Sequence, residues 1–153
     1  MFLRLIGPAR RSFDSLSEQE ILALAISSEE EDARIYRAYA DGLHAAFPAS
    51  ARVFEALAAE EDAHRRRLID LHEARFGPTI PLLRREHVRG YYERTPDWLV
   101  RPLGIGQTRD MAARMEEQAA RFYEAAAPRA ADAGTRRLLG DLAAAERGHE
   151  GLA

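Results

Sequence analysis

The chain of 153 residues contains no cysteine. Disulfide bonds, thiol catalysis and cysteine-ligated zinc or iron–sulfur centres are therefore excluded within these residues. Lysine is missing as well, since all 22 basic residues are arginine, and we attach no function to this bias. Any metal ion that the chain binds must accept oxygen and nitrogen ligands.

Long apolar runs and a marked excess of one charge are also missing. No apolar run reaches the roughly 18 residues that a membrane-spanning helix needs, and residues 1–6 are too few for a signal-peptide core. The net charge is −3, so the charge balance favours neither nucleic acid nor a membrane surface as a partner. With 46% hydrophobic and 31% charged residues, we expect one soluble, cytosol-facing globular domain.

Apolar residues recur with the 3.6-residue period of amphipathic helices in four stretches. The first helix should begin at Ser17, which forms a capping box with Glu20, and Leu16 and Ile21 are placed as a hydrophobic staple. Pro48 predicts the end of the first helix, and Gly77 followed by Pro78 predicts the end of the second. The expected helices cover residues 17–46, 48–76, 108–128 and 132–153.

The links within the first and second pairs of helices are short, so each pair should form an antiparallel hairpin. We therefore predict an all-α four-helix bundle of two antiparallel helical hairpins joined by a long crossover, residues 79–107. Because a connection of this length without structure is unusual, we expect a short helix over residues 82–89, followed by an extended segment. Alternatively, the crossover lets two chains exchange hairpins in a swapped dimer.

A pattern of glutamate, tyrosine and histidine is written twice along the chain. In the first half, Glu29 is followed by Tyr36 and then by a Glu-x-x-His pair, Glu61 and His64. The second half repeats it with Glu116, Tyr123, Glu146 and His149. A single Glu-x-x-His pair is a weak signal, whereas two pairs in matching halves indicate a site.

The register of these residues places them in the bundle interior. Glu61 and His64 interrupt an apolar seam on the second helix, and the fourth helix repeats this arrangement. An ionised glutamate on such a seam costs several kcal/mol without a partner, so a cation between the seams is indicated. Each tyrosine lies two turns beyond its own glutamate, below it on the same face, and a carboxylate is a natural partner for a buried hydroxyl.

Four carboxylates and two imidazoles in a helical bundle are the ligand set of a two-metal carboxylate site. Oxygen-rich ligands with one imidazole per ion suit iron or manganese, and two such ions can pass two electrons together to O2 or H2O2. We predict Glu61 and Glu146 as bridging ligands. The other predicted residues are the terminal ligands Glu29 and Glu116, one imidazole per ion from His64 and His149, and Tyr36 and Tyr123 behind the ligands.

Asp32 also faces inward, three residues after Glu29, but its counterpart Ala119 cannot bind a metal, so its role as a ligand is left open. The basic residues 65–67 and 84–85 are interpreted as balancing the acidic run. The remaining polar candidates are assigned to the surface or to loops: Glu30, Glu31, Glu60, Glu117, His44, His72 and His87.

The two Glu–Tyr helices and two Glu-x-x-His helices resemble those of the ferritin-like superfamily, and of rubrerythrin in particular. Residues 16–27, 58–72 and 98–104 are similar to the N-terminal ferritin-like domain of bacterial membrane-bound ferritin, in the erythrin–vacuolar iron transporter family. The resemblance covers nearly the whole chain from Phe13. It departs from rubrerythrin at Ala119, where rubrerythrins carry a further carboxylate.

This resemblance implies an N-terminal extension over residues 1–16 and a ferritin-like di-metal domain over residues 17–153. The domain would face the cytoplasm, form a homodimer and precede a C-terminal transmembrane iron-transport domain in the bacterial inner membrane, from which the present chain would have been separated. It would bind two Fe ions, with Mn left open. It would oxidise Fe(II) with O2 or H2O2 and support iron efflux under iron and peroxide stress.

Because the chain has no cysteine, it lacks a rubredoxin module, which favours ferroxidase chemistry. A rubrerythrin-like peroxidase and a non-catalytic iron-sensing or dimerising domain remain the alternatives.

Overall fold

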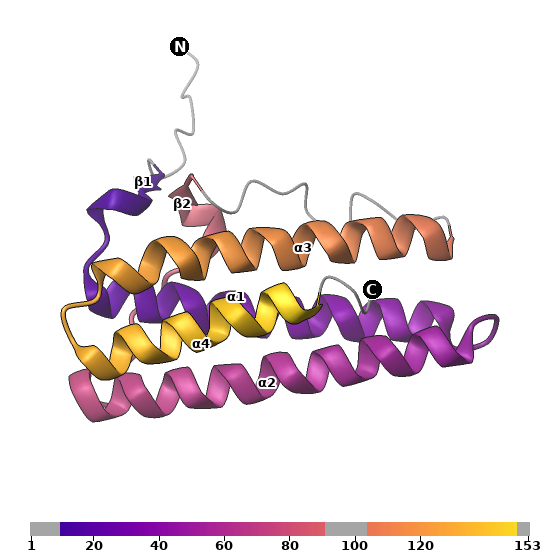
Figure 1. Cartoon of the computed structure of the whole chain (residues 1–153), viewed down its shortest axis with the longest axis horizontal. Helices are drawn as coiled ribbons and strands as arrows, with labels where there is room; N and C mark the ends of the chain where they lie inside the picture. Colours follow the sequence, from indigo (N-terminus) through magenta and orange to yellow (C-terminus); the bar gives the residue numbers. More distant parts are fainter. Residues whose placement is uncertain (1–9, 91–103, 150–153) are drawn as a thin grey trace, which may run out of the picture.

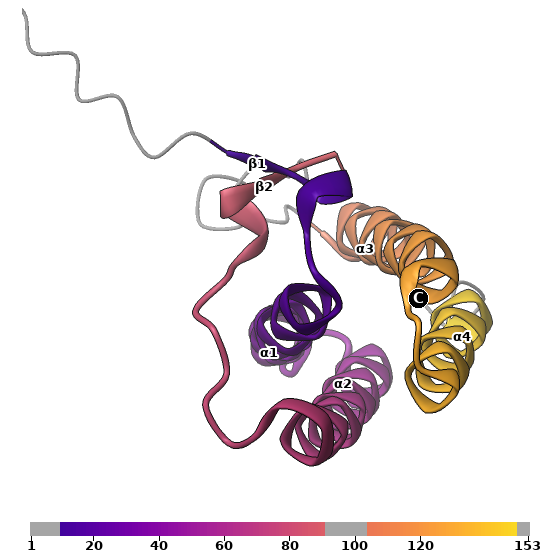
Figure 2. The ribbon, with the colours of Figure 1, turned by 90° about the vertical axis from the view of Figure 1, so that its left-hand side faces the viewer.

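The computed structural model describes residues 10–90 and 104–149, and four long helices account for most of them. Figure 1 shows the helices running along the length of the molecule, and Figure 2 shows them end-on as two adjacent pairs. The pairs are the hairpins α1–α2 and α3–α4. The predicted all-α bundle of two helical hairpins is therefore confirmed. The helices are α1 (Glu18–Leu43), α2 (Pro48–Phe76), α3 (Ile105–Ala126) and α4 (Ala133–His149).

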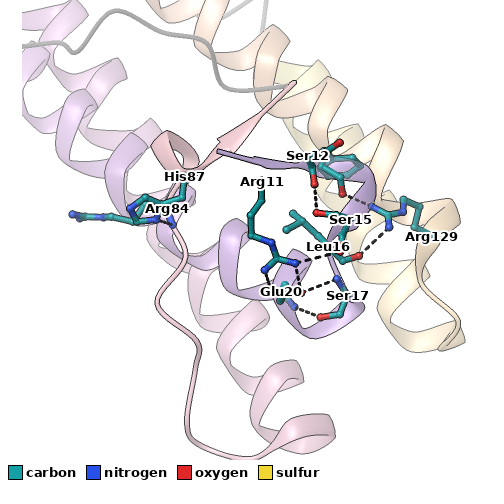
Figure 3. Close-up of polar contacts among 10 residues, drawn as sticks. Arg11, Ser12, Ser15, Leu16, Ser17, Glu20, Arg84, His87 and Arg129 are labelled. Atoms are coloured by element: carbon teal, nitrogen blue, oxygen red, sulfur yellow. Dashed lines mark hydrogen bonds and ion pairs between the residues drawn. The ribbon is translucent and has the colours of Figure 1, made fainter. Parts of the chain in front are cut away.

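The start of α1 and both ends of α2 follow the local sequence signals, whereas α1 ends at Leu43, about one turn before the predicted boundary at Phe47. Ser17 Oγ accepts a hydrogen bond from the Glu20 backbone N–H, and the Ser17 N–H donates to Glu20 Oε1, both at 3.1 Å (Figure 3). Pro48 occupies the first turn of α2, and Gly77 ends the helix with a φ of 89°, a conformation that glycine adopts without strain. Helix α3 begins at Ile105, one turn before the predicted start.

The connection after α2 differs from the predicted short helix. Residues 82–89 form only a 3-10 turn, η2 (Arg85–His87), and a two-residue strand, β2 (Val88–Arg89). Strand β2 pairs in parallel with β1 (Arg11–Ser12), from near the start of the chain. The pairing satisfies backbone groups that a local helix would otherwise satisfy, so a distant partner overrides the local preference. Of the extended segment predicted between residues 89 and 108, residues 91–103 lie outside the described residues, and residues 105–107 belong to α3.

Arg129 fixes the segment before α1 to the turn between α3 and α4. This arginine ends the 3-10 turn η4 (Ala127–Arg129), and its guanidinium lies 5.1 Å from the centroid of the Phe13 ring. It donates hydrogen bonds to the backbone carbonyls of Phe13 and Asp14 at 2.6 and 3.0 Å. A further bond reaches the Leu16 carbonyl at 2.9 Å (Figure 3). Leu16 and Ile21 are buried in the same apolar cluster, as the predicted staple requires.

The apolar core consists of two clusters with a polar layer between them. One cluster contains residues 21–26 of α1 with Leu68 and Leu142, and the other contains Tyr36, Tyr39, Ala40 and Leu43 of α1 with Phe54 and Met115. On every long helix, the glutamates and histidines of the repeat fall between or beside these clusters. Within the described residues, none of the helices combines the length and apolarity that a bilayer crossing requires.

Candidate metal centre

All six predicted ligands lie together in the interior of one chain. Helices α1 and α3 each contribute one glutamate, and α2 and α4 each contribute a glutamate and a histidine one turn apart. Every one of these side chains is buried, the most exposed residue being His64 at 8%. Folding therefore collects six ionisable groups where water cannot solvate them, which is costly unless they share protons or bind a cation.

The six residues form two overlapping groups. In each group, one ligand atom per residue lies within 4.8 Å of all the others. Glu61 and Glu146 belong to both groups, so their carboxylates lie where two neighbouring metal positions would share them. The groups are Glu29, Glu61, His64 and Glu146, and Glu61, Glu116, Glu146 and His149. This arrangement is consistent with a di-metal site.

Both imidazoles present Nδ1 to the carboxylates. His149 Nδ1 lies 3.1 Å from Glu116 Oε2 and 3.6 Å from Glu146 Oε2. His64 Nδ1 lies 3.5 Å from Glu146 Oε1 and 3.7 Å from Glu29 Oε1. The rings are nearly parallel, at 9°, with centroids 6.2 Å apart. One imidazole is therefore available to each group of ligand atoms.

Several buried oxygen and nitrogen atoms of the cluster have no hydrogen-bond partner. They are Glu29 Oε2, both oxygens of Glu61, His64 Nδ1 and Glu146 Oε1. Leaving such a group without a partner costs about 1–3 kcal/mol. All five atoms are donors of lone pairs that divalent iron or manganese accepts. The residues present therefore fit a pair of such ions.

The two tyrosines bind glutamates, but across the hairpins. The Tyr36 hydroxyl donates to Glu116, and the Tyr123 hydroxyl donates to Glu29. A tyrosine two turns from the glutamate of its own helix is about 10 Å away along the axis, whereas antiparallel α1 and α3 bring each tyrosine level with the glutamate of the other helix. The predicted contact between tyrosine hydroxyl and carboxylate is therefore present, but each hydroxyl binds the glutamate of the other helix and not that of its own helix.

Burial and mutual contacts shift the proton affinities of the cluster. Burial raises the pKa of Glu29, and of Glu61 more strongly, and it raises the pKa of Glu116 to about 8. Burial lowers the pKa of His64 and His149, but the neighbouring carboxylates outweigh it and raise the values to about 9 and about 11. Burial also opposes ionisation of Glu146, yet the two imidazoles hold the pKa of this carboxyl well below its ordinary value. The metal-free cluster therefore retains protons at neutral pH.

These shifts predict that the metal-free protein loses stability as the pH rises from 6.5 to 9. In the folded state, Glu116 keeps its proton up to its pKa of about 8 and His64 up to its pKa of about 9, while the unfolded chain, with ordinary pKa values of 4.5 and 6.5, releases both at lower pH. Stability falls with pH wherever the folded state binds more protons. Metal binding displaces the same protons, so metal affinity should rise over this interval.

Thermal unfolding with a chelator, and Co(II) titration at pH 6.5 and pH 9, measure the two trends. A melting temperature of the metal-free protein that rises with pH would contradict the prediction.

Asp32 contacts an arginine and lies outside the cluster of six predicted ligands. It lies in neither group of ligand atoms, and its Oδ1 accepts a hydrogen bond from Arg85 Nη2 at 2.9 Å. Arg85 Nε donates to Glu31 Oε2 at 2.8 Å. Asp32 and Arg85 are both buried. Arg85 thus balances part of the acidic run, as predicted, whereas a ligand role for Asp32 stays a prediction.

Two residues assigned to the surface by sequence have interior contacts. The interpretation of His72 is wrong, because its side chain is fully buried and its Nδ1 lies 3.0 Å from the Gly77 carbonyl oxygen. The end of α2 supplies this free carbonyl, and a spacing of five residues to a helix-ending glycine is the signal that could have shown it. Glu60 is half exposed, yet its carboxylate contacts His149 Nε2. Nothing in the local sequence predicts that contact.

Comparison with known proteins relates the whole bundle to one family. Residues 20–153 match the family model described as rubrerythrin, a range that includes all six cluster residues. The solved structure of a hypothetical protein from Pyrococcus furiosus, Pfu-1136390-001, is 27% identical in sequence and superimposes with a TM-score of 0.72. That similarity covers 90% of this chain and 86% of the other. None of the curated proteins compared with the chain matches it significantly.

Proposed function

The chain belongs to the rubrerythrin family, and on this premise we propose that its buried cluster binds two iron ions and oxidises Fe(II). The observation that carries the proposal is the membership of Glu61 and Glu146 in both groups of ligand atoms. Shared carboxylates hold two ions roughly 3.5–4 Å apart. When bound, an iron pair supplies two electrons together to O2 or H2O2.

The positions of the side chains suggest a separate role in metal binding for each. Glu61 and Glu146 would bridge the ions, Glu29 and Glu116 would be terminal ligands, and His64 and His149 would each bind one ion. Tyr36 and Tyr123 hold the terminal carboxylates through their hydrogen bonds. The apolar clusters on both sides exclude water, which strengthens electrostatic interactions within the site.

Anaerobic titration with Fe(II), followed by O2, tests the proposal. The wild-type protein should bind and oxidise about two irons per chain, and Glu29→Ala and Glu116→Ala should each lose most of this activity. Glu30→Ala is the matched control, because Glu30 is exposed and lies next to Glu29 on α1. Unchanged oxidation in both cluster variants would overturn the proposal. Anomalous scattering at the iron and manganese edges identifies the element that the purified protein carries.

The Fe(II) titration, repeated with H2O2 in place of O2 and combined with a measurement of association, distinguishes the ferroxidase from the two alternative functions. Oxidation of the reduced site much faster by H2O2 than by O2 would assign a rubrerythrin-like peroxidase. Stoichiometric iron binding with metal-dependent association and negligible turnover would assign an iron-sensing or dimerising domain. We favour ferroxidase chemistry, because these 153 residues contain no cysteine for a rubredoxin-type electron relay.

We extend the proposal to the full-length protein: a homodimeric domain on the cytoplasmic side of the bacterial inner membrane that passes iron to an attached transmembrane transport domain. The similarity of residues 16–27 and 58–72 to membrane-bound ferritins supports it. Cells that depend on the full-length protein to survive excess iron should lose resistance with Glu29→Ala and keep it with Glu30→Ala. Equal resistance with both variants would contradict iron delivery, and a monomeric mass by light scattering would contradict the dimer.

A further inference from the structure

The two nitrogens of His149 face different carboxylates. Nδ1 faces the buried cluster, 3.1 Å from Glu116 Oε2, whereas Nε2 contacts the carboxylate of Glu60. Glu60 lies on α2, immediately before Glu61, and its side chain is 54% exposed. The contact therefore joins the outer edge of the cluster to solvent, and it also joins the first hairpin to the second.

The other half of the repeat has no equivalent carboxylate. Glu60 precedes the glutamate of the first Glu-x-x-His pair, and the matching position before Glu146 is Ala145. A methyl side chain offers His64 no hydrogen-bond acceptor. The two halves, which supply matching ligands, thus differ at this position.

We propose that Glu60 is a positioning residue that holds His149 with Nδ1 toward the cluster and makes the His149 half the tighter of the two metal positions. The inference rests on the proposed function, because it concerns the same pair of ions. A carboxylate that accepts a hydrogen bond from the outer N–H of a ligating imidazole fixes its tautomer and ring orientation and raises its basicity. Removing such a partner typically lowers metal affinity by 10–100-fold.

Titration of the metal-free protein with Co(II) measures the two positions separately. The wild type should bind about two ions in a tighter and a weaker step. Glu60→Ala should weaken the tighter step by about 10–100-fold and leave the weaker step unchanged, and Glu60→Gln, which keeps an acceptor without the charge, should fall between. Glu55→Ala is the control, since Glu55 is an exposed glutamate on the same helix. Because Glu60 is half exposed, these variants should keep the wild-type fold, which circular dichroism verifies.

The converse substitution tests the same rule at the other histidine. Ala145→Glu places a carboxylate at the position that matches Glu60, and it should tighten the weaker step toward the stronger one. A direct signature comes from ¹⁵N spectra of the Zn(II)-loaded protein, in which the His149 Nε2–H should exchange slowly with water. In Glu60→Ala this proton should exchange faster, whereas the corresponding signal of His64 should not change.

The outcomes separate this inference from the proposed function. A wild type that binds no Co(II), Zn(II) or Fe(II) overturns both. A wild type that binds two ions, with both affinities and the His149 signal unchanged in Glu60→Ala, overturns the role of Glu60 alone. Weakening of both steps equally by Glu60→Ala also overturns it, because that result would mean a general electrostatic effect instead of an effect through His149.

Discussion

Replacing Glu61 with leucine should abolish the binding of both metal ions and, at the same time, stabilise the metal-free protein. Glu61 belongs to both groups of ligand atoms, so its loss removes a ligand from each position. In the metal-free state both of its oxygens are buried without hydrogen-bond partners. Removing these unsatisfied atoms should raise the free energy of unfolding by about 1–3 kcal/mol. Glu61 thus lowers the stability of the folded protein until metal binds.

Glu29→Leu is the matched comparison, because Glu29 belongs to one group only and accepts the hydrogen bond from Tyr123. This variant should keep the position on the His149 side, and it should destabilise the metal-free protein, since the buried Tyr123 hydroxyl loses its acceptor. Metal content per chain after Fe(II) loading, together with thermal unfolding in a chelator, measures both effects. If Glu61→Leu retains one ion, or if its metal-free form is less stable than the wild type, Glu61 is not the shared carboxylate that we describe.

Replacing Arg85 with methionine should lower the free energy of unfolding by about 3–5 kcal/mol. Its guanidinium is buried and binds the buried carboxylate of Asp32. A buried ion pair contributes little net stability, but removing one partner leaves the other charge without compensation in a poorly solvated site. Arg85 also ties the connection after α2 to α1, beside the helical turn that carries Glu29.

A double-mutant cycle tests this explanation. Asp32→Leu alone should also destabilise the protein, whereas the double variant Arg85→Met/Asp32→Leu should recover much of the loss, because neither charge then remains. Arg66→Met, at an exposed arginine of α2, should change stability by less than about 0.5 kcal/mol. Chemical denaturation of the four proteins gives the coupling free energy. Simple addition of the two single effects would show that the pair does not act as a unit.

Features fixed by neighbouring residues could be predicted from the sequence. The capping box at Ser17 and the stop at Gly77 depend on a few adjacent positions, and the structure has both. The six cluster residues could be assembled because a helix converts spacing directly into direction, and two matching halves repeat the same spacing. Their convergence needed only the hairpin topology, which the short links within each pair indicate.

Features that depend on contacts between distant segments could not be predicted. The strand β2 forms because residues 11–12 lie beside it, and no local pattern in residues 82–89 reveals that partner. The contact between Glu60 and His149 depends on how closely α2 approaches α4. The polarity of His72 indicates a solvent-exposed side chain, whereas the Gly77 carbonyl at the end of its own helix supplies a hydrogen-bond acceptor that offsets the cost of burying the imidazole.

The crossed hydrogen bonds from Tyr36 to Glu116 and from Tyr123 to Glu29 give the site a further consequence, for assembly. If one hairpin docked on the other displaced by a single helical turn, about 5.4 Å, both hydroxyls would miss their carboxylates, and the two halves of the ligand set would separate by the same distance. The cluster therefore forms only when the two hairpins dock in the correct register. A misdocked bundle would be left without its metal, and metal content would report correct assembly before any chemistry begins.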